Sequence, residues 1–210
     1  MTAPGSQVPE VVVFDLGKVL VDFDYGIAVE KVRPLCGVEC DLRHLLEKSP
    51  LLCDFESGRV SSEEFYFGVK KAAKFSGTFA EFGPMFAEIF RPIPPMIEWQ
   101  AVLRSHSIPT YIFSNTNPLA EAHIRASFPF FRNFDGYILS FEHGAMKPRP
   151  LIYEVVERMT GRRGPSILYI DDRVENVQAG KERGWRTILQ VEPSRTVEQA
   201  RSMGLPSDRL

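Results

Sequence analysis

The chain has 210 residues, of which 44% are hydrophobic and 25% charged, a composition that excludes a disordered chain and suffices for one domain with a modest insertion. A formal net charge of −2 excludes the strongly basic surface that neutralises nucleic-acid phosphates, so no nucleic-acid partner is expected. No apolar run reaches the roughly 20 residues of a membrane span and residues 1–7 lack signal-peptide features, so no membrane partner is expected.

Five short apolar runs predict the strands of a single sheet. Unbroken runs of this kind are typical of strands buried on both faces, and helical patterns separate most of them. This alternation predicts an α/β fold with a doubly wound, parallel, Rossmann-like sheet. The predicted strands are Val11–Phe14, Thr110–Phe113, Tyr137–Leu139, Ile167–Ile170 and Thr187–Leu189.

A long segment between the first two of these strands contains no convincing strand. A crossover between parallel strands needs only about a dozen residues, so residues 23–92 predict a separate, all-α insertion. Residues 1–22 and 93–210 would then form the Rossmann-like core. Aromatic side chains at helical spacing between residues 65 and 90 predict the hydrophobic core of the insertion. Its predicted helices include Ile27–Leu35, Leu42–Lys48, Ser62–Lys74 and Phe79–Phe90.

Polar side chains follow three of the predicted strands. The first strand runs into Asp15, the second into Ser114 and Asn115, and the fourth into Asp171 and Asp172. In open α/β sheets, ligands bind outside the carboxyl ends of the strands, at the switch in winding direction. These three clusters are therefore predicted to converge on one site.

The adjacent carboxylates of Asp171 and Asp172 indicate a bound cation. Two carboxylates at the end of a buried strand raise each other's pKa unless a positive charge lies beside them. Together with Asp15 they would offer the oxygen ligands that Mg²⁺ prefers. The alternative is that Asp172 caps the following helix and Asp171 is merely exposed.

Three further residues are candidates for binding phosphate. A hydroxyl from Ser114 and backbone N–H groups at Asn115 would suit phosphate oxygens, although both residue types also cap helices. Lys147, in the loop before the predicted helix Leu151–Met159, would partly offset the negative charge of the carboxylates and the phosphate. The alternative for Lys147 is an ordinary surface lysine.

Four motifs, in this order, resemble those of the haloacid dehalogenase superfamily, subfamily I, with a helical cap of type 1. They are VVVFDLGKVLVDF (11–23), YIFSNTN (111–117), MKPRPLIY (146–153) and YIDDRVENVQAG (169–180). The segment FESGRVSSEEFY (55–66) also resembles the cap of bacterial sugar-phosphate phosphatases that act on glucose 1-phosphate. The resemblance implies a magnesium-dependent phosphatase that hydrolyses a small phosphate monoester, a sugar phosphate, through a phospho-aspartyl intermediate.

The resemblance also implies a set of magnesium ligands. Asp15 would be both nucleophile and ligand, the Gly17 carbonyl a second ligand and Asp172 a third. Asp171 would complete the metal site by bracing the metal's waters.

The same resemblance assigns the groups that act on phosphate. Asp15, Ser114 and Lys147 would be the catalytic residues. Ser114 would bind the phosphoryl group, helped by the Asn115 backbone, while Lys147 neutralises and orients it. A phospho-aspartate divides one difficult displacement into two easier ones.

The sequence departs from most phosphatases of the superfamily at Gly17, where they carry an aspartate that acts as general acid and base. General acid–base help is typically worth about 10²- to 10⁴-fold, so turnover should be slower unless another group donates the proton. Asp22, Asp24 or a residue of the insertion are candidates. Other residues that could face the site are Phe55, Glu56, Arg59, Arg91 and His123, for each of which the alternative is an ordinary packing or surface position.

Three other functions are considered. A metal-independent 2-haloacid dehalogenase would lack the acidic pair, and a phosphomutase would need the aspartate that Gly17 replaces. A non-catalytic phosphometabolite-binding protein would explain Gly17.

Three cysteines without a CxxC pair indicate neither a disulfide framework nor zinc and favour the cytoplasm. The sequence does not indicate an oligomeric state.

Overall fold

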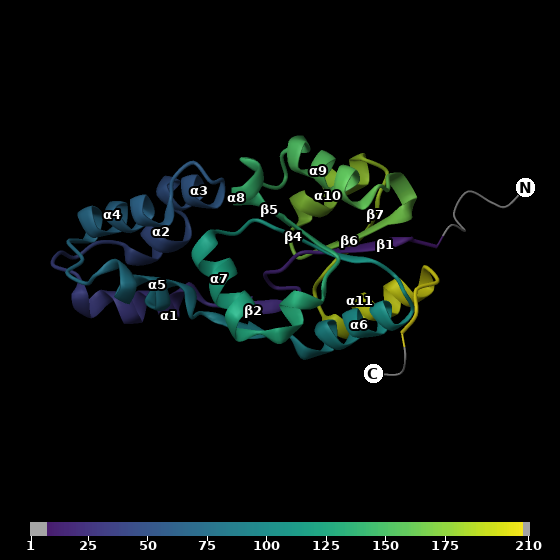
Figure 1. Ribbon diagram of the computed structural model, residues 1–210, viewed down its shortest axis with the longest axis horizontal. Helices are drawn as coiled ribbons and strands as arrows, with labels where there is room; N and C mark the ends of the chain where they lie inside the picture. The colour runs from purple at the N-terminus through teal and green to yellow at the C-terminus, as the bar shows by residue number, and fades with distance from the viewer. Residues whose placement is uncertain (1–7, 208–210) are drawn as a thin grey trace, which may run out of the picture.

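The computed structural model describes residues 8–207, which form seven strands with helices around them (Figure 1). The strands are β1 (Val11–Phe14), β2 (Val21–Phe23), β3 (Phe90–Pro92), β4 (Thr110–Ser114), β5 (Gly136–Leu139), β6 (Ile167–Asp171) and β7 (Arg186–Leu189).

Five of the strands form one parallel sheet in the order β5-β4-β1-β6-β7. The first strand lies in the centre, and the chain adds β4 and β5 on one side before β6 and β7 on the other. This arrangement confirms the predicted doubly wound, Rossmann-like α/β fold. Because winding reverses at β1, the carboxyl ends of β4, β1 and β6 lie next to one another at the switch point.

Helices cover both faces of the parallel sheet (Figure 1). The core helices are α6 (Pro94–Ser105), α7 (Pro118–Ser127), α8 (Ser140–His143), α9 (Pro150–Thr160), α10 (Val174–Glu182) and α11 (Pro193–Ser202), with the 3₁₀ turns Pro129–Asn133 and Gly164–Ser166. Side chains alternate along β1, so Val12 and Phe14 pack with α6, α7 and α11, while Val11 and Val13 pack with α9.

A second hydrophobic core lies in the helical insertion. Its buried aromatic residues include Phe55 and Phe65, whose rings stack 4.6 Å apart. The aromatic side chains at helical spacing are therefore mainly core residues, except Phe67, which is 62% exposed. The helices are α1 (Tyr25–Val32), α2 (Leu42–Glu47), α3 (Pro50–Glu56), α4 (Ser62–Ala73) and α5 (Phe79–Ala87), with a 3₁₀ turn at Arg33–Leu35.

The prediction that residues 23–92 contain no strand is wrong at both ends of the segment. Strand β3 pairs antiparallel with β2, and the paired Cα atoms run from Val21 with Pro92 to Phe23 with Phe90. A three-residue strand that ends in proline lacks the length and alternation from which strands are predicted. The chain thus enters and leaves the insertion through a two-stranded ribbon. Helix α3 was also not predicted, although Ser49 and Pro50 are a capping residue and a first-turn proline.

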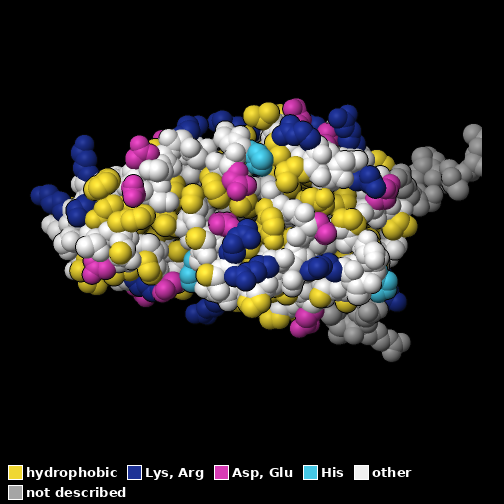
Figure 2. Space-filling view, viewed as in Figure 1, with side chains coloured by type: hydrophobic (Ala, Val, Ile, Leu, Met, Phe, Trp, Pro, Cys, Tyr) yellow, Lys and Arg dark blue, Asp and Glu magenta, His cyan; other side chains and the backbone are white. Residues whose placement is uncertain are grey.

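Charges of both signs are interspersed on the face shown in Figure 2, without a broad basic area. This distribution agrees with the small net charge of the sequence. Within residues 8–207, no helix is long and apolar enough to cross a membrane.

Candidate active site

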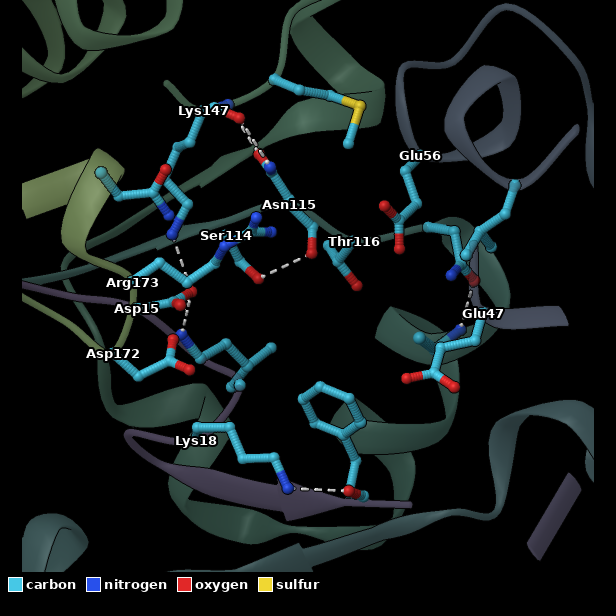
Figure 3. Close-up of a pocket in the computed structure, with 18 of the residues that line it drawn as sticks. Asp15, Lys18, Glu47, Glu56, Ser114, Asn115, Thr116, Lys147, Asp172 and Arg173 are labelled. Carbon is cyan, nitrogen blue, oxygen red and sulfur yellow. Dashed lines mark hydrogen bonds and ion pairs between the residues drawn. The ribbon is translucent and has the colours of Figure 1, made fainter. Parts of the chain in front are cut away.

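The carboxyl ends of β1, β4 and β6 bring the predicted site residues together around one buried lysine (Figure 3). The Lys147 Nζ atom lies 2.9 Å from Asp15 Oδ1 and 2.7 Å from Asp171 Oδ2, and it donates a hydrogen bond to the Phe113 carbonyl. The Lys147 side chain is only 1% exposed. The alternative of an ordinary surface lysine is therefore excluded.

Asp171 is fully buried and its two oxygens are occupied by the protein itself. Besides Lys147, the Tyr169 hydroxyl donates to Oδ2, while the Arg173 N–H donates to Oδ1 at 2.8 Å. The Asn176 amide donates to both oxygens. Burial opposes the ionised form of Asp171, but the charge of Lys147 and the hydrogen bonds from Lys147, Tyr169 and the Arg173 N–H outweigh it and lower the pKa. The idea that Asp171 is merely exposed is wrong.

Three carboxylates form a cluster that could hold a metal ion. Asp15, Asp171 and Asp172 each offer an oxygen within 4.8 Å of the others. Burial raises the pKa of Asp172, and the charge of Asp171 raises it further, so a cation would relieve the repulsion. Gly17 lines the same pocket. An all-oxygen donor set with room for water and phosphate fits Mg²⁺.

The Asp15 carboxylate has one oxygen bound by the protein and one free of protein donors. Its Oδ1 accepts hydrogen bonds from Lys147 and from the Leu16 N–H, which lies 2.7 Å away. Among the described residues no donor contacts Oδ2. Burial raises the pKa of Asp15 to about 8 in the absence of metal, Lys147 lowers it, and Asp171 raises it.

Ser114 and Asn115 form the wall of the pocket beside Asp15 (Figure 3). The Asn115 side chain is held by two bonds to the Lys147 backbone: its Nδ2 donates to the carbonyl, and its Oδ1 accepts from the N–H at 2.8 Å. Because these bonds occupy the Asn115 side chain, the backbone of Asn115 is the part that can bind a ligand. The following residues lead into α7, whose first turn is capped by Asn117.

The site opens into a pocket of about 480 Å³ between the sheet and the insertion. The insertion contributes Tyr25, Glu47, Lys48, Leu52 and Glu56 to its lining. This volume suits a metabolite of a few carbon atoms rather than a polymer.

The structure places two proposed proton donors away from the pocket lining. Asp22 pairs with Lys18, and Asp24 accepts a hydrogen bond from the Gly26 N–H as the cap of α1. Neither lines the pocket, so neither is placed to replace the acid that is missing at Gly17. Glu56, in contrast, lines it.

The other candidates for facing the site do not line the pocket. Phe55 is fully buried in the core of the insertion, and Arg59 forms an ion pair with Asp54 at 2.7 Å. Arg91 lies in the ribbon at β3. His123 does not line the pocket; its ring packs against Phe90, which does, and against Phe128, and burial lowers its pKa.

Sequence reasoning missed several residues that support or line the site. Tyr169 lies two residues before Asp171, so strand alternation could have placed both on one face. Asn176 lies in the first turn of α10, and its side chain reaches back to Asp171 at the end of β6. No pattern in the sequence predicts this contact. Glu47 reaches the pocket only because the insertion folds over the sheet.

Comparison with known proteins identifies the family. Residues 9–184 match the family model of haloacid dehalogenase-like hydrolases. The chain belongs to this family. A curated relative is the D-ribitol-5-phosphate phosphatase of Bacteroides thetaiotaomicron, 27% identical over 186 residues that cover 84% of this chain and 89% of that protein. These matches confirm the predicted family and hydrolase class, and the curated relative is itself a phosphatase.

Solved structures of haloacid dehalogenase-like proteins share the fold. One is a family enzyme from B. thetaiotaomicron in complex with magnesium and inorganic phosphate, with a TM-score of 0.78, 20% identity and coverage of 87% of this chain and 93% of that chain. Another is a predicted haloacid dehalogenase-like hydrolase from Porphyromonas gingivalis, with a TM-score of 0.75, 24% identity and coverage of 87% and 91%.

Proposed function

We propose that this hydrolase is a magnesium-dependent phosphatase that transfers the phosphoryl group of a small sugar or polyol phosphate to Asp15 and then to water. The observation that carries the proposal is the buried bridge of Lys147 between Asp15 and Asp171, with Asp172 and Ser114 at the same pocket. Such a site combines a held nucleophile with charges that neutralise phosphate.

In the proposed first step, the free oxygen of Asp15 attacks phosphorus, and the bond from phosphorus to the ester oxygen breaks. The leaving oxygen takes up a proton from solvent water and departs as an alcohol. Lys147 and the Ser114 hydroxyl stabilise the phosphoryl oxygens. Mg²⁺, held by Asp15, Asp172 and the Gly17 carbonyl, would supply positive charge to the phosphoryl group and keep Asp15 ionised.

In the second step, water attacks phospho-Asp15, releases inorganic phosphate and restores the carboxylate. Asp171 would act throughout by positioning Lys147 and the water shell of the metal, because its own oxygens are occupied.

The substrate class is inferred from the pocket and from the relatives. The pocket volume of about 480 Å³ accommodates a small phosphate ester. The curated relative acts on D-ribitol 5-phosphate, a linear polyol phosphate. Small sugar and polyol phosphates are therefore the first esters to assay, and a small phosphorylated metabolite is the proposed partner.

Two other functions remain as alternatives. A metal-independent dehalogenase would have no use for three carboxylates whose oxygens lie within 4.8 Å of one another. A non-catalytic binding protein would keep the phosphate pocket but not need a free Asp15 oxygen next to Lys147.

The test is phosphate release from a panel of sugar and polyol phosphates, with and without Mg²⁺, by the wild-type chain and by Asp15→Asn. Release that requires Mg²⁺ and disappears in the variant supports the proposal. Phosphate release that survives chelation would refute the magnesium dependence. Binding of phosphate without turnover of any ester would favour the non-catalytic protein.

A further inference from the structure

A carboxylate without a partner faces the pocket from the helical insertion. Glu56 is the last residue of α3, and in Figure 3 its carboxylate points into the cavity, near Thr116 and across from Asp15 and Asp172. Among residues 8–207, no side chain or backbone N–H donates a hydrogen bond to this carboxylate, and no ion pair neutralises it. A ligand that enters the pocket is therefore free to bind it.

The backbone of Glu56 is anchored to the sheet domain. Its carbonyl accepts a hydrogen bond from the Ser140 hydroxyl, which in turn accepts one from the Thr116 N–H at 3.0 Å. Two residues later, Gly58 has a φ of +68°, and a Cβ atom there would lie 2.1 Å from the Phe141 carbonyl oxygen. This close approach fixes the end of α3 against α8.

The surrounding charges leave Glu56 largely uncompensated. Among the described residues, Arg173 is the one positive group that lowers its pKa, and the Arg173 guanidinium already pairs with Glu175. The position of Glu56 at the carboxyl end of a helix also disfavours a negative charge. Burial, the larger effect, raises its pKa to about 7.

The remaining groups on this side of the pocket add negative charge or are solvated. Glu47 of α2 pairs with Arg43. Burial raises the pKa of the Tyr25 hydroxyl on α1, and the negative charges of Glu56 and Glu47 raise it further. Lys48 is exposed to solvent, where its charge is screened. The other charged side chains that line the pocket are Asp15, Lys18, Lys147 and Asp172, of which Lys18 pairs with Asp22.

We propose that Glu56 selects the leaving group: it accepts hydrogen bonds from an uncharged polyhydroxyl alcohol and rejects esters that carry a second negative charge. This inference rests on the proposed phosphatase function and deepens it by naming the substrate class. A hydroxyl of the substrate supplies the donor that Glu56 lacks in the protein. A carboxylate or second phosphate at that place would confront an unpaired negative charge in a partly desolvated pocket.

The test compares two esters with the same three-carbon skeleton, glycerol 3-phosphate and 3-phosphoglycerate, which differ by a hydroxymethyl group and a carboxylate. Each is measured with Mg²⁺ as a substrate or as a competitor of a chromogenic phosphate ester. At about pH 8, the wild type should prefer the uncharged ester by about 10- to 100-fold in kcat/KM or in inhibition constant. Because both esters use the same Asp15, titration of the common machinery cancels in this ratio.

Glu56→Gln keeps the shape of the side chain but removes its charge, so the ratio should fall toward one, mainly because 3-phosphoglycerate improves. Glu63→Gln is the matched control, since Glu63 is an exposed glutamate of the same insertion outside the pocket. It should leave the ratio unchanged.

The wild-type ratio also tests the proposal without any variant. It should decrease when the pH falls from about 8 to about 5.5, since Glu56 then becomes protonated. A ratio that stays constant with pH, or that Glu56→Gln leaves unchanged in a folded and active variant, would overturn the proposal. Absence of phosphate release from every ester tested would instead refute the phosphatase function itself and the inference with it.

Discussion

Replacing Lys147 by methionine should destabilise the protein as well as inactivate it. The substitution nearly keeps the apolar stem but removes the positive charge that lies 2.9 Å from Asp15 and 2.7 Å from Asp171. Removing one partner of a buried ion pair typically costs about 3–5 kcal/mol, because a charge remains buried without compensation. At about 2–4 °C per kcal/mol for a chain of this size, the expected decrease in Tm is about 6–20 °C.

The measurement is thermal unfolding followed by circular dichroism, without Mg²⁺, near pH 8. Lys181→Met is the matched control, since Lys181 is exposed on α10 and should tolerate the change. Adding Asp171→Asn to Lys147→Met should recover part of the lost Tm, because it removes one of the two uncompensated carboxylates. A decrease of less than about 2 °C for Lys147→Met would refute the view that this lysine neutralises both carboxylates.

Three further predictions concern Glu56, Asp172 and Gly17. Because the pKa of Glu56 is raised to about 7, its stabilising contribution is present at low pH and is lost as the pH rises from about 4.5 to 7. The free energy of unfolding of Glu56→Gln, relative to that of the wild type, should therefore be higher at pH 8 than at pH 4.5 by up to about 3 kcal/mol, as measured by urea denaturation of both proteins at both pH values. Mg²⁺ at about 100 times its Kd should stabilise the wild type by about 2.7 kcal/mol, and Asp172→Asn should largely abolish the corresponding increase in Tm. Gly17→Asp should lower the Tm without raising kcat, because a Cβ atom at residue 17 would lie 2.8 Å from a Phe23 ring carbon. Adding Phe23→Leu should restore the Tm, and an increase in kcat for Gly17→Asp alone would contradict this view.

The sequence predicts the sheet and the ends of its strands because the signals there are local. The four apolar residues of β1 and the five-residue β6 are buried throughout and each run ends at or just before an aspartate, so period and composition suffice. The switch-point rule then brings Asp15, Ser114 and Asp171 together without any knowledge of the side-chain contacts.

The contacts that define the site chemically depend on tertiary packing, which local patterns do not encode. Lys147 lies 132 positions after Asp15 in the chain, and only the path of the loop before α9 inserts it between two carboxylates. The orientation of the insertion decides that Glu56 lines the pocket while its neighbour Phe55 is buried. The ribbon of β2 and β3 was missed for a related reason: its strands are stabilised by each other and are too short to leave a pattern.

The ribbon has a consequence for how such a protein can change. The chain departs from the sheet domain at Phe23 and rejoins it at Phe90, and these residues are paired neighbours. The segment between them has its own hydrophobic core. We expect that it can be exchanged as one contiguous segment while Asp15, Lys147 and Asp171 keep their positions. The proposed reaction would then depend on the sheet domain and the proposed substrate choice on the insertion, so grafting a different insertion should change specificity without altering the proposed catalytic residues.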